Sequence, residues 1–315
     1  MKRYLGGLLA GAVLLVVLGC FSPKALAAPN RFEPGTLVFD NFNKEKTILQ
    51  PEEGSYWWID GQGTLPNGDP ARVRGEHNCE LQTCVQIYRQ EDGESYEAVR
   101  LTGYPTTTTA NYTNANLSEG IDGADGDPVY GGQAYPGPWN PTPGHDVVVE
   151  THLKFGPNFH IDGSGGAKGT GGVWLWSNPF SQGAPNPFAI YDGVGFSWVS
   201  NDSEILQGMT MMVTKGAFPV YVNPVTGINI NDWNTFKFVW SQDVSGNQSV
   251  TYYVNGTQTG VAQLYAGVTT MQNMGLEVWL DNQAYKPSQY PNYIQRILIP
   301  EERHFDIDWV SISKD

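Results

Sequence analysis

Apolar and polar residues alternate in short runs along most of this chain, and Gly, Pro and Asn separate the runs. Alternation with a period of two is typical of a strand with one buried face, whereas helical periodicity is nearly lacking. The pattern predicts strands at 36–43, 97–102, 147–155, 173–177, 193–199, 209–214, 235–242, 249–254, 275–281 and 304–313. Asn255-Gly256 predicts a tight hairpin, because both residues tolerate the positive φ of a primed turn. These elements favour an all-β fold, a two-sheet antiparallel β-sandwich.

The first 28 residues are predicted to be a signal peptide. Lys2 and Arg3 precede an apolar run, Leu5–Leu18, that is too short to span a bilayer comfortably. Two processing sites remain open. Residues 25–27 (Ala-Leu-Ala) form a small-x-small cleavage site, while residues 17–20 resemble a bacterial lipobox ending at Cys20. Both interpretations predict an exported chain, extracellular or held at the cell envelope. Only the lipobox interpretation adds a membrane attachment, through a lipid anchor at Cys20.

Residues 29–315 are expected to form a single domain, since β-sandwiches often exceed 200 residues. A loop rich in Thr, Asn, Gly and Pro is predicted over 103–145, and loops of such length are commonly functional or disordered. Without the three basic residues of the signal segment, 15 basic and 32 acidic residues leave a net charge of −17. This charge argues against nucleic acid and anionic membranes as partners and is compatible with uncharged glycans.

Cysteine is sparse in the chain. Cys79 and Cys84 lie five residues apart, and in an oxidising compartment they are expected to form a small disulfide-closed loop. A zinc site is disfavoured, because two thiols without further ligands bind the metal poorly. We therefore expect a local disulfide bond rather than a metal centre.

The order of several segments resembles the laminarinase/lichenase family of glycoside hydrolases, within the concanavalin A-like lectin and glucanase fold. The matching segments are LVFDNF (37–42), VVVETHLKF (147–155), GGVWLW (171–176), WNTFKFVW (233–240), VTYYVNGTQTG (250–260) and FDIDWVSIS (305–313). The resemblance covers most of residues 36–313. It implies a jelly-roll sandwich with a concave sugar-binding face, and a polysaccharide as the partner.

The strand that matches the family's catalytic strand lacks acidic residues at the expected positions. The family carries its carboxylates there as E-x-D-x-x-E, whereas the positions facing the cleft here are Gly193, Gly195 and Ser197. The alternate positions, Val194 and Phe196, are apolar, as expected for side chains that face the core. Retaining glycosidases need two carboxyl groups about 5–5.5 Å apart. We therefore expect the family's usual hydrolysis to be lost.

One later strand carries an acid–Trp–acid pattern. Glu277, Trp279 and Asp281 share one face of 275–281, and we expect them to bind sugar by ring stacking and hydrogen bonds. The alternative is that these three residues have no binding role and lie on an exposed sheet face, with the Trp packed under a loop. Of Trp174 and Trp176, one is expected to line the cleft and the other to lie in the core. The two acids fit a catalytic pair poorly, because four residues of strand span about 13 Å.

An enzyme with relocated catalytic residues remains an alternative to a binding protein. Glu150 and His152 share a face of the strand 147–155, expected next to the cleft, and could act with Glu277 and Asp281 in a glycosidase or lyase. The simpler interpretation is a structural His bonded to a carboxylate. A structural or adhesive envelope protein is a third hypothesis.

Two places suggest structural calcium. Asp122, Asp125 and Asp127 cluster in the long loop, and hard oxygen ligands on a Gly-rich turn suit Ca²⁺. The family resemblance implies a second site, where Asp308 matches an aspartate that helps to hold Ca²⁺ on the convex face. A solvated acidic loop and a buried hydrogen-bonded aspartate are the respective alternatives. We expect no other cofactor.

Overall fold

The computed structural model describes strand segments at 36–40, 58–64, 70–74 and 83–89, and residues 97–109, 114–119, 139–177, 192–215, 218–264, 274–289 and 294–315. Phe32–Asp315 form one compact unit. The predicted signal segment, including Cys20, lies outside the described residues. The described part contains no helix with the length and apolar character needed to cross a membrane.

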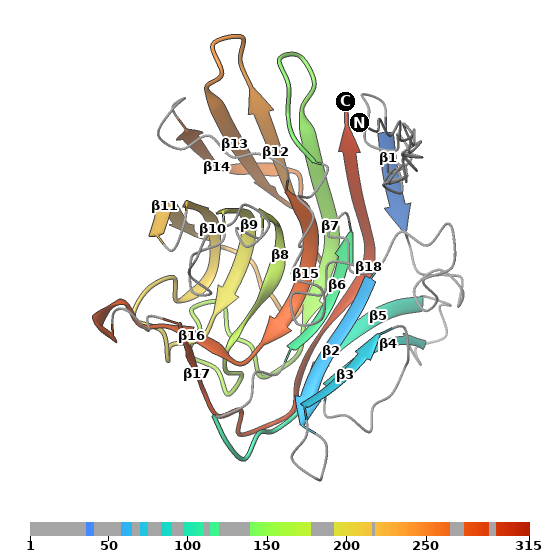
Figure 1. The fold of residues 1–315 in the computed structure, drawn as a ribbon, viewed down its shortest axis with the longest axis vertical. Coiled ribbons are helices and arrows are strands. Elements are labelled where there is room, and N and C mark those ends of the chain that lie inside the picture. The colour runs from blue at the N-terminus through green and yellow to red at the C-terminus, as the bar shows by residue number, and fades with distance from the viewer. Residues whose placement is uncertain are drawn as a thin grey trace, which may run out of the picture. The chain divides into compact units, whose positions relative to one another are not determined.

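Two antiparallel sheets account for most of the described strands (Figure 1). Sheet A runs in the order β14 (Thr257–Leu264), β13 (Gln248–Val254), β12 (Asn234–Gln242), β7 (Val147–Phe155), β18 (Arg303–Lys314), β5 (Glu97–Gly103) and β4 (Thr83–Arg89), with β1 (Thr36–Asp40) also paired to β18. Sheet B runs in the order β11 (Phe218–Pro224), β10 (Gly208–Lys215), β9 (Asp192–Val199), β8 (Thr170–Ser177), β15 (Gly275–Asp281), β6 (Asn114–Glu119), β2 (Trp58–Thr64) and β3 (Pro70–Arg74). The short strands β16 (Gln283–Tyr285) and β17 (Ile294–Arg296) pair separately and flank η3 (Pro287–Gln289). The predicted all-β jelly-roll sandwich is confirmed.

The main hydrophobic core lies between the two sheets. Phe196 of sheet B contacts Phe236 and Tyr252 of sheet A, with ring centroids 5.1 and 5.3 Å apart. The alternating burial along β7 and β12 shows how sheet A turns every second side chain toward this core. Each sheet therefore has an inner face in the core and an outer face on the other side.

All ten predicted strands are present, whereas the predicted long loop is interrupted by a strand. Asn255 and Gly256 have φ values of 51° and 76°, which confirms the primed hairpin turn between β13 and β14. Residues 103–145, however, are not one uninterrupted loop, because β6 lies within them and pairs with both β15 and β2. This strand is short and largely polar, so its pairing with segments distant in sequence is what establishes it.

Candidate functional site

The candidate site is the outer face of sheet B, centred on β8, β9 and β15. Residues directly opposite each other in an antiparallel pair share a face. Trp174 on β8 lies opposite Gly195 on β9 and Glu277 on β15. The alternate positions Val173 and Leu175 lie in the main core, so the tryptophan positions of β8 belong to the outer face.

Three tryptophans form a stack on this face. The rings of Trp174 and Trp279 lie 4.5 Å apart at 30°, and those of Trp174 and Trp176 lie 6.1 Å apart at 17°. Met212 of β10 joins the stack in a cluster separate from the main core. Trp174 is 7% exposed and belongs to a buried cluster, whereas Trp176 is half-buried. The two rings therefore differ in burial as expected, although they share the outer face because they occupy alternate positions of one strand.

The two acids of β15 are buried and hydrogen-bonded on the same face. Glu277 is 8% exposed, and its carboxylate accepts from Trp174 Nε1 at 2.8 Å and Asn116 Nδ2 at 2.9 Å. Asp281 is 4% exposed, and its Oδ1 accepts from the Thr170 hydroxyl at 2.7 Å. Both carboxylates therefore compensate their loss of water with bonds to neighbouring strands.

Thr170 links the Asp281 carboxylate to the tryptophan stack. Its Oγ1 donates to Asp281 and accepts from Trp279 Nε1 at 3.0 Å. The backbone N–H of Gln283 also donates to Asp281 Oδ1, at 3.0 Å. This chain of bonds holds the Trp279 indole in one orientation, so the acids act here as positioning groups for the rings.

A buried guanidinium supports the strand end at Asp281. Arg303 of β18 is 2% exposed and donates to the backbone carbonyls of Lys168 and Asp281, the latter at 2.7 Å. Burial lowers the pKa of Arg303 to about 10, and the nearby Asp281 charge partly offsets this effect. Arg303 thereby joins sheet A to the end of β15.

The tryptophan stack occupies the space where β9 would carry acidic side chains. A Cβ atom added at Gly193 would lie 2.8 Å from Cε3 of Trp174, and one added at Gly195 would lie 2.2 Å from the Val173 carbonyl oxygen. Neither position accepts a side chain unless Trp174 or the backbone moves. Glycine at these positions is thus required by the packing of the adjacent strand.

Two buried polar atoms on this face have no hydrogen-bond partner among the described residues. They are Oδ1 of Asn116, whose amide nitrogen binds Glu277, and Oγ of Ser197. Both positions share the outer face, because Asn116 lies opposite Trp279 and Ser197 lies opposite Gly172. Unpaired buried polar atoms are rare in native proteins, so this face retains unused hydrogen-bonding capacity.

Exposure increases toward one end of the site. Trp176 is half-buried, in contrast to the buried Trp174 and Trp279. Beside it, Lys215 Nζ donates to Asp192 Oδ2 at 2.5 Å, and the Asp192 and Lys215 side chains are 20% and 37% exposed. The Trp176 end of the stack is therefore the accessible end.

Sequence reasoning missed Asn116, Thr170, Met212 and Arg303. The alternation of Ala115 and Leu117 with Asn114, Asn116 and Ser118 could have indicated β6 and its polar face. No local signal marks Arg303, because its partners are backbone carbonyls of other segments. These residues enter the site only through strand pairing.

Glu150 and His152 do not adjoin this face. Both lie on β7, which sits in sheet A between β12 and β18, whereas Glu277 and Asp281 lie in sheet B. His152 Nδ1 instead lies 2.8 Å from Asp308 Oδ2, and its ring contacts Trp233. The expectation that β7 borders the site is wrong, because this strand turns alternate side chains to the core and to the opposite surface.

The metal and disulfide predictions receive no test from the described residues. Asp122, Asp125, Asp127 and Cys79 lie outside those residues, and nothing is described of the Cys84 side chain. Asp308 is paired with His152. Within the described ranges, no group of three or more His, Cys, Asp or Glu side chains is placed to hold a metal ion.

Several solved structures have a similar shape at low sequence identity. A laminarinase from Flavobacterium sp. UMI-01 is 9% identical with a TM-score of 0.46, over 88% of this chain and 98% of that chain. An endo-β-1,4-glucuronan lyase from the fungus Trichoderma reesei is 10% identical with a TM-score of 0.45, over 82% and 94%. A prokaryotic β-1,3-1,4-glucanase (lichenase) from a mouse hindgut metagenome is 10% identical with a TM-score of 0.41, over 88% and 98%. TM-scores below 0.5 at such low identity support no functional conclusion. No protein-family model and no curated protein matches the chain.

Proposed function

We propose that this chain is an exported carbohydrate-binding protein that binds polysaccharide on the outer face of sheet B without hydrolysing it. One observation carries the proposal: three indoles stack on the outer face of sheet B, and the last of them, Trp176, is half-buried at the accessible end. A ring that is partly open to solvent offers apolar surface to a ligand. Asp192 and Lys215, whose side chains are partly exposed at the same end, offer polar groups. A ligand with both apolar and polar surface fits this end of the stack.

A sugar has the required combination of surfaces. Its C–H groups form apolar patches that stack on indole rings, and its hydroxyls both donate and accept hydrogen bonds. Glu277 keeps Trp174 in place by accepting from its indole N–H, and Trp176 stacks on Trp174. The accessible ring of Trp176 is therefore preorganised for the ligand.

The packing supports binding without hydrolysis. Gly193 and Gly195 leave no room for side chains beside Trp174. Glu277 and Asp281 lie four residues apart on one strand, a separation of about 13 Å. Inverting glycosidases need about 6.5–9.5 Å and retaining enzymes about 5–5.5 Å, so this pair does not match either geometry.

Trp176 is the residue best suited to test the proposal, because it is half-buried at the accessible end. Trp176→Ala should weaken binding to a glycan, first identified on an array, by about two- to tenfold, since a ring contact contributes about 0.5–1.5 kcal/mol. The matched control is Trp233→Ala, which removes a half-buried indole on the outer face of sheet A. Trp279→Ala should also weaken binding, but its burial makes unfolding a competing cause.

Three results would overturn the proposal. The first is that the full-length protein binds no glycan on the array. The second is that Trp176→Ala and Trp233→Ala change the dissociation constant equally. The third is release of reducing ends or unsaturated products from pooled polysaccharides, which would establish an enzyme instead. Activity that survives Glu277→Gln combined with Asp281→Asn would then remove both acids from the mechanism.

A further inference from the structure

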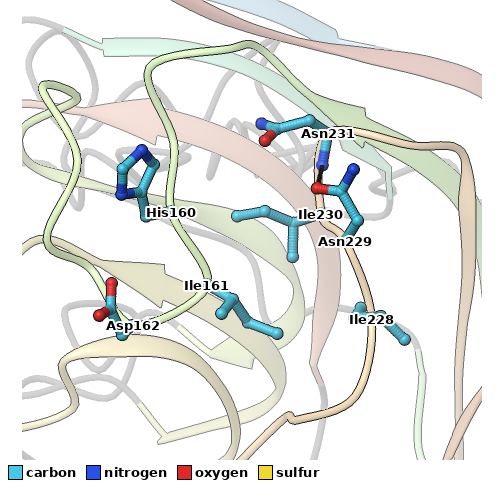
Figure 2. A pocket seen from close by; sticks show the side chains of 7 residues that line it. All are labelled: His160, Ile161, Asp162, Ile228, Asn229, Ile230 and Asn231. Atoms are coloured by element: carbon cyan, nitrogen blue, oxygen red, sulfur yellow. Dashed lines mark hydrogen bonds between the residues drawn. The ribbon is translucent and has the colours of Figure 1, made fainter.

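A pocket lies where two connections between strands meet (Figure 2). One wall comes from the β7–β8 connection and carries His160, Ile161 and Asp162, and the other comes from the β11–β12 connection, residues 228–231. Its volume is about 290 Å³. This is near the lower end of the range for ligand pockets, about 300–1,000 Å³, and suits a single small ring.

Hydrogen bonds fix both walls of the pocket. The Asn231 side-chain amide donates to the backbone carbonyls of Gly156 at 2.6 Å and Phe159 at 3.1 Å, which ties one connection to the other. The backbone carbonyl of Ile161 accepts from Met209 N at 2.7 Å, which anchors the first wall to β10. A ligand that enters would therefore meet a formed site, and binding would not carry the entropic cost of ordering two loops.

The pocket combines apolar and polar groups. Ile161 and Ile228 are partly buried and supply aliphatic surface, Ile230 is buried behind them in the main core, and His160, Asp162 and the Asn229 carboxamide supply polar groups. Figure 2 shows Ile161 directed toward the opposite wall, with His160 and Asp162 on its own side.

Asp162 determines which ligand charge is acceptable. Its Oδ1 accepts from the Ser164 hydroxyl at 2.6 Å and from Ser164 N–H at 3.0 Å. These bonds lower the pKa of Asp162, so the carboxylate is ionised at neutral pH. The charge disfavours phosphate and carboxylate ligands. A metal ion is also disfavoured, because the described residues contain no cluster of three protein ligands here.

We propose that this pocket binds one uncharged sugar unit, with the C–H surface against the isoleucines and the hydroxyls bonded to Asp162, His160 and Asn229. The choice of a sugar rests on the proposed function. The pocket wall at Ile161 packs on Gly208 at the start of β10. Strand pairing connects this point to the candidate site, because Gly208 lies opposite Val199, Val199 opposite Thr170, and Thr170 opposite Asp281. Gly208 and Asp281 are three strand spacings apart, about 14 Å. Thr170 and Trp176 lie six residues apart on β8, which is about 20 Å. The pocket therefore suits a sugar unit other than the one that stacks on Trp176.

Methyl NMR of the full-length protein tests this assignment. Isoleucine δ1 methyls are labelled, and glucose, galactose, mannose and N-acetylglucosamine are titrated separately. At least one sugar should shift the methyls of Ile161 and Ile228 in a saturable way. Asp162→Ala should abolish the shifts while methyls elsewhere in the spectrum stay unchanged, and Asp162→Asn should retain part of the affinity.

The two proposals fail in different ways. Saturable shifts that persist in Trp176→Ala support the pocket even if polymer binding to sheet B is disproved. If no sugar shifts these methyls, or if Asp162→Ala leaves the shifts unchanged, the pocket assignment is overturned. Loss of polymer binding in Trp176→Ala would then still support the sheet B surface.

Discussion

Gly195→Ala is the most direct test of the packing that shapes the candidate site. The added Cβ would lie 2.2 Å from the Val173 carbonyl oxygen and 2.6 Å from Trp174 Cα. Both contacts are with the backbone of β8, which cannot rotate away as a side chain would. The strands would have to separate by roughly 1 Å to restore ordinary contact distances, and the register on which the tryptophan stack depends would be disturbed.

The expected cost follows from two opposing contributions. Overpacking of this kind costs about 1–3 kcal/mol, and a rigid backbone contact favours the upper half of that range. Replacing Gly by Ala returns about 0.4–1 kcal/mol by reducing the entropy of the unfolded chain. We therefore expect Gly195→Ala to lower the free energy of unfolding by about 1–2 kcal/mol, measured by urea denaturation with tryptophan fluorescence.

Gly166→Ala is the matched control. Its added Cβ would lie 3.4 Å from Glu301 Oε2, an ordinary contact, so the entropic contribution alone remains and the variant should be as stable as the wild type or slightly more so. If Gly195→Ala and Gly166→Ala agree within about 0.5 kcal/mol, the close approach of β8 and β9 is refuted. The steric reason for glycine at the position of an expected acid would then be lost.

Two further predictions concern pH. Burial, with a smaller contribution from Arg100, lowers the pKa of His304 below 6.5. As the pH falls, the unfolded chain therefore binds this proton before the folded protein does, and the free energy of unfolding should decrease below pH 6.5. His304→Gln should make that decrease smaller in urea titrations, and an unchanged pH dependence would contradict the assignment. Burial raises the pKa of Tyr252 well above 10, so its contribution to stability is present below pH 10 and is lost as pH rises further. Its hydroxyl donates to the Met212 carbonyl at 2.6 Å, so Tyr252→Phe should lower the free energy of unfolding by about 1 kcal/mol at neutral pH. The variant should also lose less stability than the wild type above pH 10. If stability falls equally with pH in both proteins, this role of Tyr252 is disproved.

Strands with regular alternation could be predicted to within a residue at each end, whereas short polar strands could not. The bounds of β7 match the prediction, because apolar residues at alternate positions reflect one buried face, and β12 and β13 each begin one residue earlier than predicted. The bounds of β15 also match, although this strand is buried on both faces. β6, β2 and β3 are short and polar or Gly-rich, and their strand character depends on pairing with β15 and with one another. Local propensity carries little information about such pairing.

The acids and tryptophans of the site could be predicted, whereas its other residues and its arrangement could not. The alternation in β15 assigns Glu277, Trp279 and Asp281 to one face, and the structure brings them together with Trp174 and Trp176. It separates Glu150 and His152 from them. Whether two strands belong to the same sheet depends on the topology, and alternation along each strand contains no such information.

The amino-acid sequence by itself determined the fold class, the face to which each side chain of a regular strand turns, and the lack of acids at Gly193 and Gly195, because these properties follow from a period of two and from residue identity. The tertiary structure alone decided that Trp174 fills the space above those glycines, that Glu277 orients its indole, and that the pocket at Asp162 exists. Each of these depends on contacts between segments far apart along the chain, whose relative positions are set by sheet order and register.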